Sequence, residues 1–165
     1  MSEQKTSCIF CKIANGTIPC YKVYEDNEVI AFLDVNPSSR GHTLVLPKEH
    51  FSSMVTCPKN LLDHVMEVAQ LIAQAQIAQL GASGANVITN IGEKAGQTIP
   101  HFHVHVIPRY EKDGILLQLP TSKLNEQDVK LIVDSIQKGI RSYLASARFS
   151  FRYRFSCVTA RKRIK

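Results

Sequence analysis

The sequence predicts one α+β domain with a mostly antiparallel five-stranded sheet, and three observations lead to this prediction. Short apolar runs of strand length recur between turn residues from Tyr21 to Ile107. One longer stretch, 58–80, instead repeats its apolar residues at helical spacing. Residues 101–107 alternate histidine with apolar residues, which is the period of a strand with one buried face. At 165 residues the chain is long enough for one domain with a core and short for two.

Each element follows from local residue patterns. Residues 8–19 begin with a short helix that Asn15-Gly16 ends. The polar turn Asp26-Asn27-Glu28 joins the first two strands into a hairpin. The five strands are expected at 21–25, 29–33, 41–47 and 85–90 and in the histidine stretch.

Two helices complete the predicted fold. The long helix has Pro58 in its first turn, ends at Gly81, and has one apolar and one glutamine-rich face. Its predicted buried stripe consists of Leu61, Leu62, Val65, Val68, Ala69, Ile72 and Leu80. Its predicted exposed face, which suits a partner surface because it lacks charge, contains Gln70, Gln74, Gln76 and Gln79. Asn125 is the expected cap of a last helix, and the apolar stripe of that helix consists of Leu124, Val129, Ile132, Val133, Ile136, Ile140 and Leu144.

The net charge of +6 comes entirely from the end of the chain. Residues 147–165 contain seven basic and no acidic residues, and removing them leaves thirteen basic against fourteen acidic residues. We therefore expect a nearly neutral domain at 1–146 and a basic-aromatic tail at 147–165, with no nucleic-acid binding by the domain itself. The tail alternates aromatic residues with arginine and serine, so it either contacts phosphates and bases or is a poorly packed extension.

We do not expect this chain to be secreted or to span a membrane. No apolar run approaches the length needed to span a bilayer, and residues 1–5 are polar, unlike a signal peptide. Five cysteines without a regular framework of spacings suit a reducing compartment. The sequence therefore predicts a cytoplasmic protein, with the nucleus as the alternative, and no membrane partner.

Three of the six histidines, His101, His103 and His105, fall on one face of the fifth predicted strand. Imidazole changes protonation near neutral pH and can act as nucleophile, acid or base, so we interpret this strand as catalytic. A polar outer face and a metal patch are the alternatives. A nucleophilic imidazole needs an acceptor for its other N–H, and a backbone carbonyl of this strand is expected to supply it.

Other segments are candidates for the rest of a binding site. Gln97 and Thr98 offer an amide and a hydroxyl to an anion, and Asp34 offers a carboxylate to ribose hydroxyls. The apolar residues that could hold a planar ring are Ile9, Phe10, Ile13, Ile18 and Phe32. Each of these five has an ordinary core role as its alternative, and Asp34 has a role in the turn before Asn36-Pro37.

Cys8 and Cys11 have the spacing of a zinc-binding pair. A structural zinc needs four ligands, and spacing alone leaves His42, His50, His64 and the histidine strand as candidates for the other two. Two reduced thiols without a metal are the alternative.

The pattern His-φ-His-φ-His-φ-φ at 101–107, where φ is apolar, resembles the signature of the histidine triad (HIT) superfamily. Further segments occur in the order of that family, namely Cys8–Ile13, Ile18-Pro19, Val29–Asp34, Gly41–Lys48, Asn90 and Gly96–Thr98. The resemblance covers about residues 8–110. It is greatest to the Hint branch, in particular to small bacterial and protozoal members with the cysteine pair. It implies the HIT fold, with one long helix and a C-terminal helix.

The resemblance implies catalytic roles for four histidines. His103 is the implied nucleophile, which attacks the α-phosphorus of a nucleotide to form a covalent nucleotidyl-imidazole. His105 would contact the same phosphate and help proton transfer to the leaving group, His42 would support the triad, and His101 would complete it. No catalytic cofactor is implied, but zinc-carrying relatives imply a structural zinc with the ligands Cys8, Cys11, His50 and His101.

The resemblance also implies a nucleotide pocket. Asp34 would bind the ribose, and Asn90, Gln97 and Thr98 would hold phosphate oxygens and the leaving-group side. The residues that would enclose the purine are Ile9, Phe10, Ile13, Ile18, Phe32 and Leu44.

The implied reaction is hydrolysis of purine nucleoside 5′-phosphoramidates by a homodimer, with an AMP-like substrate. Fhit-like hydrolysis of dinucleoside polyphosphates is the nearest alternative, because Gly96–Thr98 and Pro108-Arg109 suit it too. The nucleotidyl transferase branch typically has glutamine where this chain has His105, which counts against that branch. A nucleotide-binding interaction module, in which catalysis is incidental, is the alternative from another class.

Overall fold

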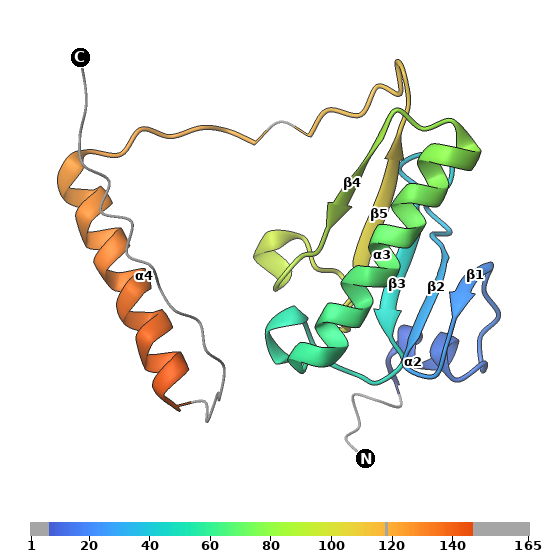
Figure 1. Cartoon of the computed structure of the whole chain (residues 1–165), viewed down its shortest axis with the longest axis horizontal. Helices are drawn as coiled ribbons and strands as arrows, with labels where there is room; N and C mark the ends of the chain where they lie inside the picture. The colour runs from blue at the N-terminus through green and yellow to red at the C-terminus, as the bar shows by residue number, and fades with distance from the viewer. Residues whose placement is uncertain (1–6, 118, 147–165) are drawn as a thin grey trace. The chain divides into compact units, whose positions relative to one another are not determined.

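The computed structural model describes residues 7–117 and 119–146 and confirms the α+β architecture (Figure 1). The chain divides into two compact units, Met1–Leu116 and Leu117–Lys165. The first unit contains one sheet in which every neighbouring pair of strands is antiparallel, in the order β1-β2-β3-β5-β4. The strands are β1 (Lys22–Glu25), β2 (Val29–Leu33), β3 (Thr43–Pro47), β4 (Gly84–Ile88) and β5 (Val104–Arg109).

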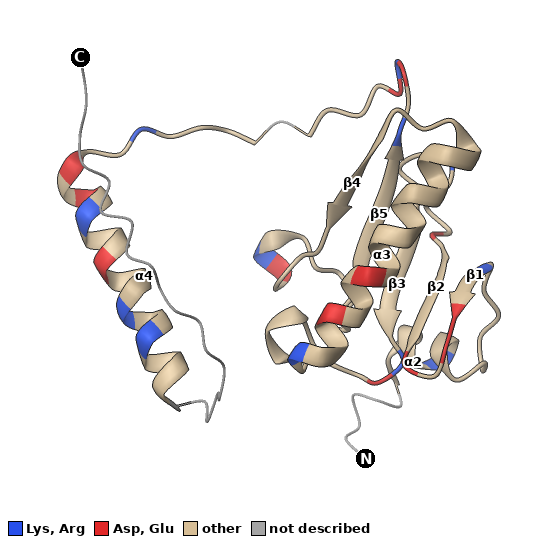
Figure 2. Cartoon of the chain, in the orientation of Figure 1, with Lys and Arg blue, Asp and Glu red and all other residues tan. Residues whose placement is uncertain are grey.

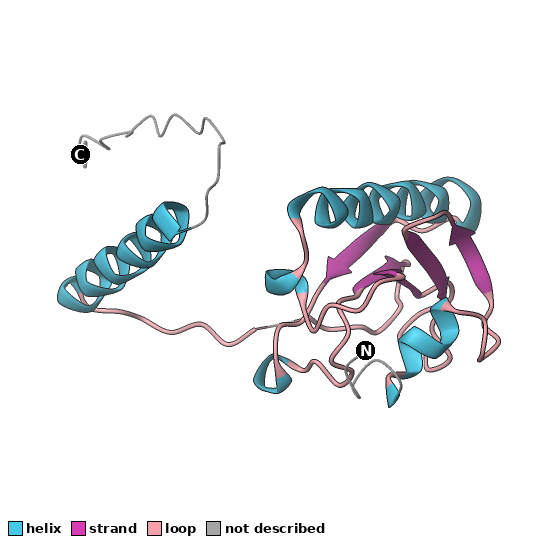
Figure 3. Cartoon of the chain, turned by 90° about the horizontal axis from the view of Figure 1, so that it is seen from below, coloured by secondary structure: helices cyan, strands magenta, loops and turns pink. Residues whose placement is uncertain are grey.

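The two faces of the sheet carry different helices. α3 (Lys59–Leu80) covers one face and the short α2 (Ile9–Ala14) lies on the other, as Figure 3 shows. Because side chains alternate along a strand, each face has its own apolar cluster. The cluster under α3 includes Val29, Ala31, Val45, Phe102, Val104, Val106, Leu61, Val65, Val68, Ala69 and Ile72. The cluster under α2 includes Phe10, Ile30, Phe32, Leu44 and Leu46.

The long helix forms where it was predicted, but burial departs from the prediction at three residues. Leu62 and Leu80 of the predicted buried stripe are only partly buried. Gly81 ends α3 in the left-handed conformation, with φ of 70°, and Gln70, Gln74 and Gln79 are exposed. Gln76 was predicted to be exposed but is buried, and its Nε2 donates to the backbone carbonyls of Gly41, just before β3, and of Val106 in β5. Gln76 lies four residues after the buried Ile72, so helical spacing places it on the core stripe. No charged residue occurs in the second half of α3 (Figure 2).

The histidine stretch is only partly a paired strand, because β5 begins at Val104. Before that point, the carbonyl of Pro47 accepts a hydrogen bond from the His101 ring (2.9 Å) instead of continuing the ladder. The predicted alternation nevertheless holds. Phe102 packs under α3, whereas the His103 ring contacts Phe10 of α2 on the opposite face.

The second unit contains α4 (Glu126–Ser146). Asn125 caps this helix as predicted, because its Oδ1 accepts the backbone N–H of Asp128 (2.9 Å). The apolar stripe of α4 is exposed within its own unit. Among the described residues, no helix combines the length and apolar character needed to cross a bilayer. The expected tail at 147–165 and the polar N-terminal residues 1–5 lie outside the described residues.

His64 of α3 forms a hydrogen bond between the long helix and the first hairpin. Its Nε2 donates to Asp26 Oδ2 (2.7 Å), which also accepts the hydroxyl of Tyr24 (2.7 Å). His64, one of the candidate zinc ligands, therefore has a different partner. The hydrogen bond to Asp26 raises the pKa of His64 above its ordinary value of 6.5.

We expect the change His64→Gln to destabilise the protein more at about pH 5 than at about pH 8. A histidine whose pKa is raised by folding contributes stability below its unfolded pKa and loses that contribution as pH rises through the folded pKa. Because the pair is partly exposed, the difference in unfolding free energy should be about 0.5–1 kcal/mol. Urea unfolding of both proteins measures it, and a difference independent of pH would contradict this origin.

Candidate active site

Strand register gathers the candidate residues on the sheet face opposite α3. Phe32 lies opposite Leu44, and Leu44 lies opposite His105. Because directly opposed residues of an antiparallel pair share a face, these three side chains form a row. Phe10 of α2 packs on this face, with its ring centroid 5.9 Å from that of Phe32 and 5.1 Å from that of His103.

A backbone carbonyl sets the tautomer of His103. Its Nδ1 lies 2.6 Å from the carbonyl oxygen of His101, and a carbonyl can only accept, so Nδ1 carries the proton and Nε2 a lone pair. Burial lowers the pKa of His103 below its ordinary value of 6.5, although this hydrogen bond opposes the shift. His103 is therefore a neutral imidazole with an unprotonated Nε2.

His105 has the opposite arrangement because of His42. The backbone N–H of Ser38 donates to His42 Nδ1 (3.2 Å), so the proton of His42 is on Nε2. That N–H donates to His105 Nδ1 (3.0 Å), which leaves the proton of His105 on its Nε2. Burial, with His103 and His42 nearby, lowers the pKa of His105 to about 4. At Nε2, His103 thus has a free lone pair, whereas the neighbouring His105 has an N–H donor.

Asp34 adjoins this chain of imidazoles. Its Oδ2 lies 3.6 Å from His42 Nδ1, and its Oδ1 accepts the N–H of Asn36 (2.8 Å), as in the turn role expected from the sequence. Asp34, His42 and His105 have ligand atoms close enough together to hold a metal. Both nitrogens of His42 already have hydrogen-bond partners, however, so we interpret this group as a hydrogen-bonded chain.

The loop before the histidine strand uses the amide of Gln97 internally. The side chain is buried, and its Nε2 donates to the carbonyls of Ser52 (2.6 Å) and Ile99 (3.0 Å). A contact between this amide and a phosphate would therefore require those bonds to break. The Nδ2 of Asn90 donates to the Gly96 carbonyl (3.3 Å) in the same loop.

The predicted purine-binding residues do not all come together. Phe10, Phe32 and Leu44 belong to one buried cluster, and Ile13 packs against it. Ile18 is partly buried. Ile9 is 45% exposed and, with Thr98, lines a cavity of about 320 Å³ beside Cys8 and His50.

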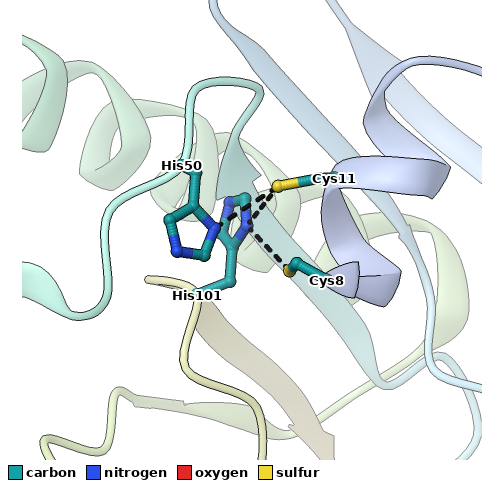
Figure 4. Close-up of side chains that lie close together, drawn as sticks. All are labelled: Cys8, Cys11, His50 and His101. Atoms are coloured by element: carbon teal, nitrogen blue, oxygen red, sulfur yellow. Dashed lines mark hydrogen bonds between the residues drawn. The ribbon is translucent and has the colours of Figure 1, made fainter. Parts of the chain in front are cut away.

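The side chains of the cysteine pair lie beside those of two histidines (Figure 4). Cys8 and Cys11 approach the side chains of His50 and His101, and the ligand atoms of all four lie within 4.8 Å of one another. Cys8 Sγ is 3.5 Å and Cys11 Sγ 3.6 Å from His101 Nδ1, and Cys11 Sγ is 3.3 Å from His50 Nδ1. No disulfide joins the cysteines of the described residues.

These four residues fit a zinc ion. Zinc bonds of about 2.3 Å to sulfur and about 2.0–2.1 Å to nitrogen place tetrahedral ligands about 3.5 Å apart. The observed separations of 3.3–3.6 Å agree with that value. His101 Nε2 donates to the carbonyl of Pro47, so its Nδ1 lone pair faces the cysteines, as expected of a ligand oriented by its second nitrogen. Burial lowers the pKa of His101 to about 4, which favours the neutral form that binds metals.

Ser38 was not predicted from the sequence as a residue of this site. Its contribution is a backbone N–H, and no side-chain signal could have indicated it. The pairing of His50 with the cysteines was open from spacing alone and was specified only by the family resemblance.

A HIT domain model matches residues 15–112, which is more than half of the chain. The chain belongs to the HIT family. The adenylylsulfatase HINT3 of Arabidopsis thaliana is 39% identical over 147 residues, covering 88% of this chain and 73% of that protein. The adenosine 5′-monophosphoramidase hnt1 of Schizosaccharomyces pombe is 35% identical over 136 residues, covering 82% of this chain and 99% of that protein.

Solved structures of HIT proteins share this fold. The crystal structure of a zinc-bound histidine triad family protein from Mycobacterium smegmatis matches with a TM-score of 0.66 at 33% identity, covering 84% of this HIT protein and 99% of that chain. The HIT fold with its five-stranded sheet, long helix and C-terminal helix is thus established for this chain.

We expect His105 to titrate with a pKa of about 4, well below the ordinary 6.5, because burial and its two histidine neighbours disfavour the charged ring. The ring should therefore stay neutral down to about pH 5. Chemical shifts of the His105 ring followed against pH measure this. His64 is an internal comparison, since its pKa is raised, and a His105 midpoint at or above 6.5 would contradict the burial argument.

Proposed function

We propose that this HIT protein hydrolyses purine nucleoside 5′-phosphoramidates through a covalent nucleotidyl-His103 intermediate. The observation that carries the proposal is the pairing of an unprotonated Nε2 on His103 with a protonated Nε2 on His105. The first is a nucleophile and the second a donor to phosphate oxygen, and their ring centroids are 4.9 Å apart. Similarity to the yeast protein named an adenosine 5′-monophosphoramidase supports the substrate class.

The first step exchanges one phosphorus–nitrogen bond for another. The Nε2 lone pair of His103 forms a bond to the α-phosphorus while the bond to the amine breaks. The amine nitrogen keeps the electrons of that bond and takes up a proton, which His105 Nε2–H would supply through the phosphate oxygen that it contacts. The proton of His103 stays on Nδ1 and is donated to the His101 carbonyl, whose negative dipole stabilises the positive charge that develops on the ring. The Nε2–H of His105 donates to a phosphate oxygen.

The second step releases the nucleotide. Water forms a bond to phosphorus while the bond to His103 breaks, and the electrons of the broken bond return to His103 Nε2 as the original lone pair. The proton that water releases would restore the Nε2–H of His105. In total the phosphorus gains the hydroxyl of water and the amine gains its hydrogen, so no metal or redox partner enters the balance. Two displacements of similar kind replace one difficult hydrolysis, which is the advantage of covalent catalysis.

The proposed nucleotide pocket lies along the row beside His105. Phe10, Ile13, Phe32 and Leu44 would enclose the purine, because they form the apolar cluster next to His103. Asp34 would accept ribose hydroxyls with its Oδ2. Asn90, Gln97 and Thr98 would act at the leaving-group side, Gln97 by holding the loop in shape. Ile9 and Ile18 would border the pocket.

Turnover measurements can distinguish the proposed phosphoramidate substrate from two others that carry different leaving groups. We expect kcat/KM to be higher for adenosine 5′-phosphoramidate than for diadenosine triphosphate, as in the Hint branch. Adenosine 5′-phosphosulfate belongs in the same comparison, because the Arabidopsis relative is named an adenylylsulfatase. Faster cleavage of diadenosine triphosphate would instead assign the chain to the Fhit-like alternative. Nucleotide binding without turnover of any of these would favour the interaction module.

We expect His103→Ala to lower turnover of adenosine 5′-phosphoramidate by about 10³-fold or more, because it removes the nucleophile. Rapid quenching of the wild-type protein with labelled substrate should trap a nucleotide on His103, which peptide mass spectrometry can map. His64→Gln is the matched control, since His64 is bonded to Asp26 away from the triad, and it should retain turnover. A label on another residue would refute the assignment.

We also propose that Cys8, Cys11, His50 and His101 hold a structural zinc. When bound, the ion would supply a cross-link between α2 and the start of the histidine strand. The donor set and separations support zinc over two free thiols, and a zinc-bound relative has the same fold.

The uncharged second half of α3, with Leu71 and Ile77 exposed, supports the expected homodimer.

We expect about one zinc per chain, and we expect Cys11→Ala to reduce zinc content several-fold and to lower the melting temperature. Elemental analysis of the purified protein measures the first quantity and calorimetry the second. Cys57→Ala is the matched control, because Cys57 lies outside the metal cluster and should keep the zinc. Equal zinc content in the Cys11 and Cys57 variants would rule out this site.

A further inference from the structure

The loop between β2 and β3 is tied to the end of β5 by two hydroxyl groups. Ser39 Oγ donates to the carbonyl of Pro108 (2.6 Å), and Tyr110 Oη donates to the carbonyl of Arg40 (2.8 Å). The partners are 69 and 70 residues apart in sequence, so these bonds hold the loop against a different strand. We call these two bonds, made by Ser39 and Tyr110, the loop clamp.

The clamped loop presents the backbone N–H of Ser38 to His42 Nδ1, at 3.2 Å. Asp34 Oδ2 lies 3.6 Å from the same nitrogen. These two groups make opposite demands, because an amide N–H needs a lone pair on Nδ1 and a carboxylate needs a proton there. His42 Nδ1 can therefore satisfy only one of them at a time.

Whether Ser38 or Asp34 bonds to His42 Nδ1 determines whether His105 Nε2 presents an N–H or a lone pair to a substrate. With Ser38 as the partner, His42 donates from Nε2, and His105 keeps its proton on its own Nε2; the Ser38 N–H contact to His42 Nδ1 implies this arrangement. With Asp34 as the partner, His42 Nε2 would accept from His105 Nδ1, and His105 Nε2 would carry a lone pair. Each ring holds one proton in both arrangements, so the exchange changes neither the total charge nor the number of protons.

We infer that the loop clamp selects the tautomers of the His42–His105 pair, which makes Ser39 and Tyr110 positioning residues for the triad. Holding the loop keeps the Ser38 amide within reach of His42, and a loosened loop lets Asp34 take its place. The catalytic consequence rests on the proposed function, because a lone pair on His105 Nε2 would repel the phosphate oxygen that an N–H stabilises. Gly41 contributes to the loop's shape, since it has φ of +94° and an added Cβ would lie 2.7 Å from the Leu80 side chain.

The tautomers can be observed directly in the full-length protein without any ligand. Long-range proton–nitrogen correlation spectra of protein labelled with ¹⁵N-histidine distinguish protonated from unprotonated ring nitrogens. The wild type should show protons on Nε2 of both His42 and His105. In the double variant Ser39→Ala/Tyr110→Phe, we expect a population with the proton on Nδ1 of both rings. Unchanged tautomers in that variant, or Nδ1-protonated His42 in the wild type, would overturn the inference.

A change at Asp34 tests the competition itself. Asparagine can donate its amide hydrogen to His42 Nδ1, whereas the carboxylate can only accept. Adding Asp34→Asn to the clamp variant should therefore return both protons to Nε2, which a general loss of order in the loop would not do. Thr17→Val is the matched control, because it removes an exposed hydroxyl bonded only within a turn, and it should leave the tautomers as they are. Failure of Asp34→Asn to restore them would show that Asp34 is not the competing partner.

Activity gives a second and separate readout. We expect the clamp variant to lose about tenfold in kcat for adenosine 5′-phosphoramidate, a part of what the loss of a donor to a developing oxyanion costs. Its dissociation constant for adenosine should stay within about twofold, because adenosine has no phosphate to contact His105. A clamp variant that carries Ser39→Thr in place of Ser39→Ala retains a hydroxyl at this position and should recover kcat. If the wild type hydrolyses none of these substrates, the proposed function fails while the tautomer measurement still decides the inference.

Discussion

The hydrogen bond between His103 Nδ1 and the His101 carbonyl, 2.6 Å long, determines the chemistry available to this site. An imidazole offers two nitrogens, and which one carries the proton depends on its partner. A carbonyl partner leaves His103 with a free lone pair, and the Pro47 carbonyl likewise leaves His101 with a lone pair toward the cysteines. The Ser38 amide has the reverse effect on His42. Three neighbouring side chains of one kind thus acquire different roles from three backbone groups.

The backbone of the histidine stretch, including the His101 carbonyl, is held in place by the apolar layer on the other face of the sheet. Phe102 and Val104 alternate with the histidines and are almost completely buried under α3. Burying each such side chain contributes about 1.5–3 kcal/mol, which offsets the conformational entropy lost when one imidazole is restrained. Burial of the histidine rings on the opposite face lowers the pKa values of His101, His103 and His105, so the rings stay neutral while their protons are fixed by geometry.

Periodicity was sufficient to predict most of the fold. The apolar spacing of α3, its end at Gly81 and the cap at Asn125 depend on nearby residues, and each was found where it was expected. The exceptions involve distant partners. Helical spacing places Gln76 on the core stripe, and a polar side chain is accommodated there because the distant carbonyls of Gly41 and Val106 accept its amide hydrogens. The paired part of β5 starts at Val104, and the Pro47 carbonyl that precedes this pairing accepts from the His101 ring instead. The Gln97 amide, expected to face an anion, is bonded to Ser52 and Ile99.

The sequence by itself determined that His101, His103 and His105 share a face opposite a hydrophobic core, because alternation along an extended chain is a local property. It also carried the HIT signature and the cysteine pair. Spacing left the partner of Cys8 and Cys11 open and the family resemblance implied His50, which the tertiary structure places beside them. Only the tertiary structure decided that Ser38 rather than Asp34 is the closer partner of His42. The two nitrogens of an imidazole remain equivalent choices until a partner is placed beside one of them, and here those partners come from segments distant in the chain.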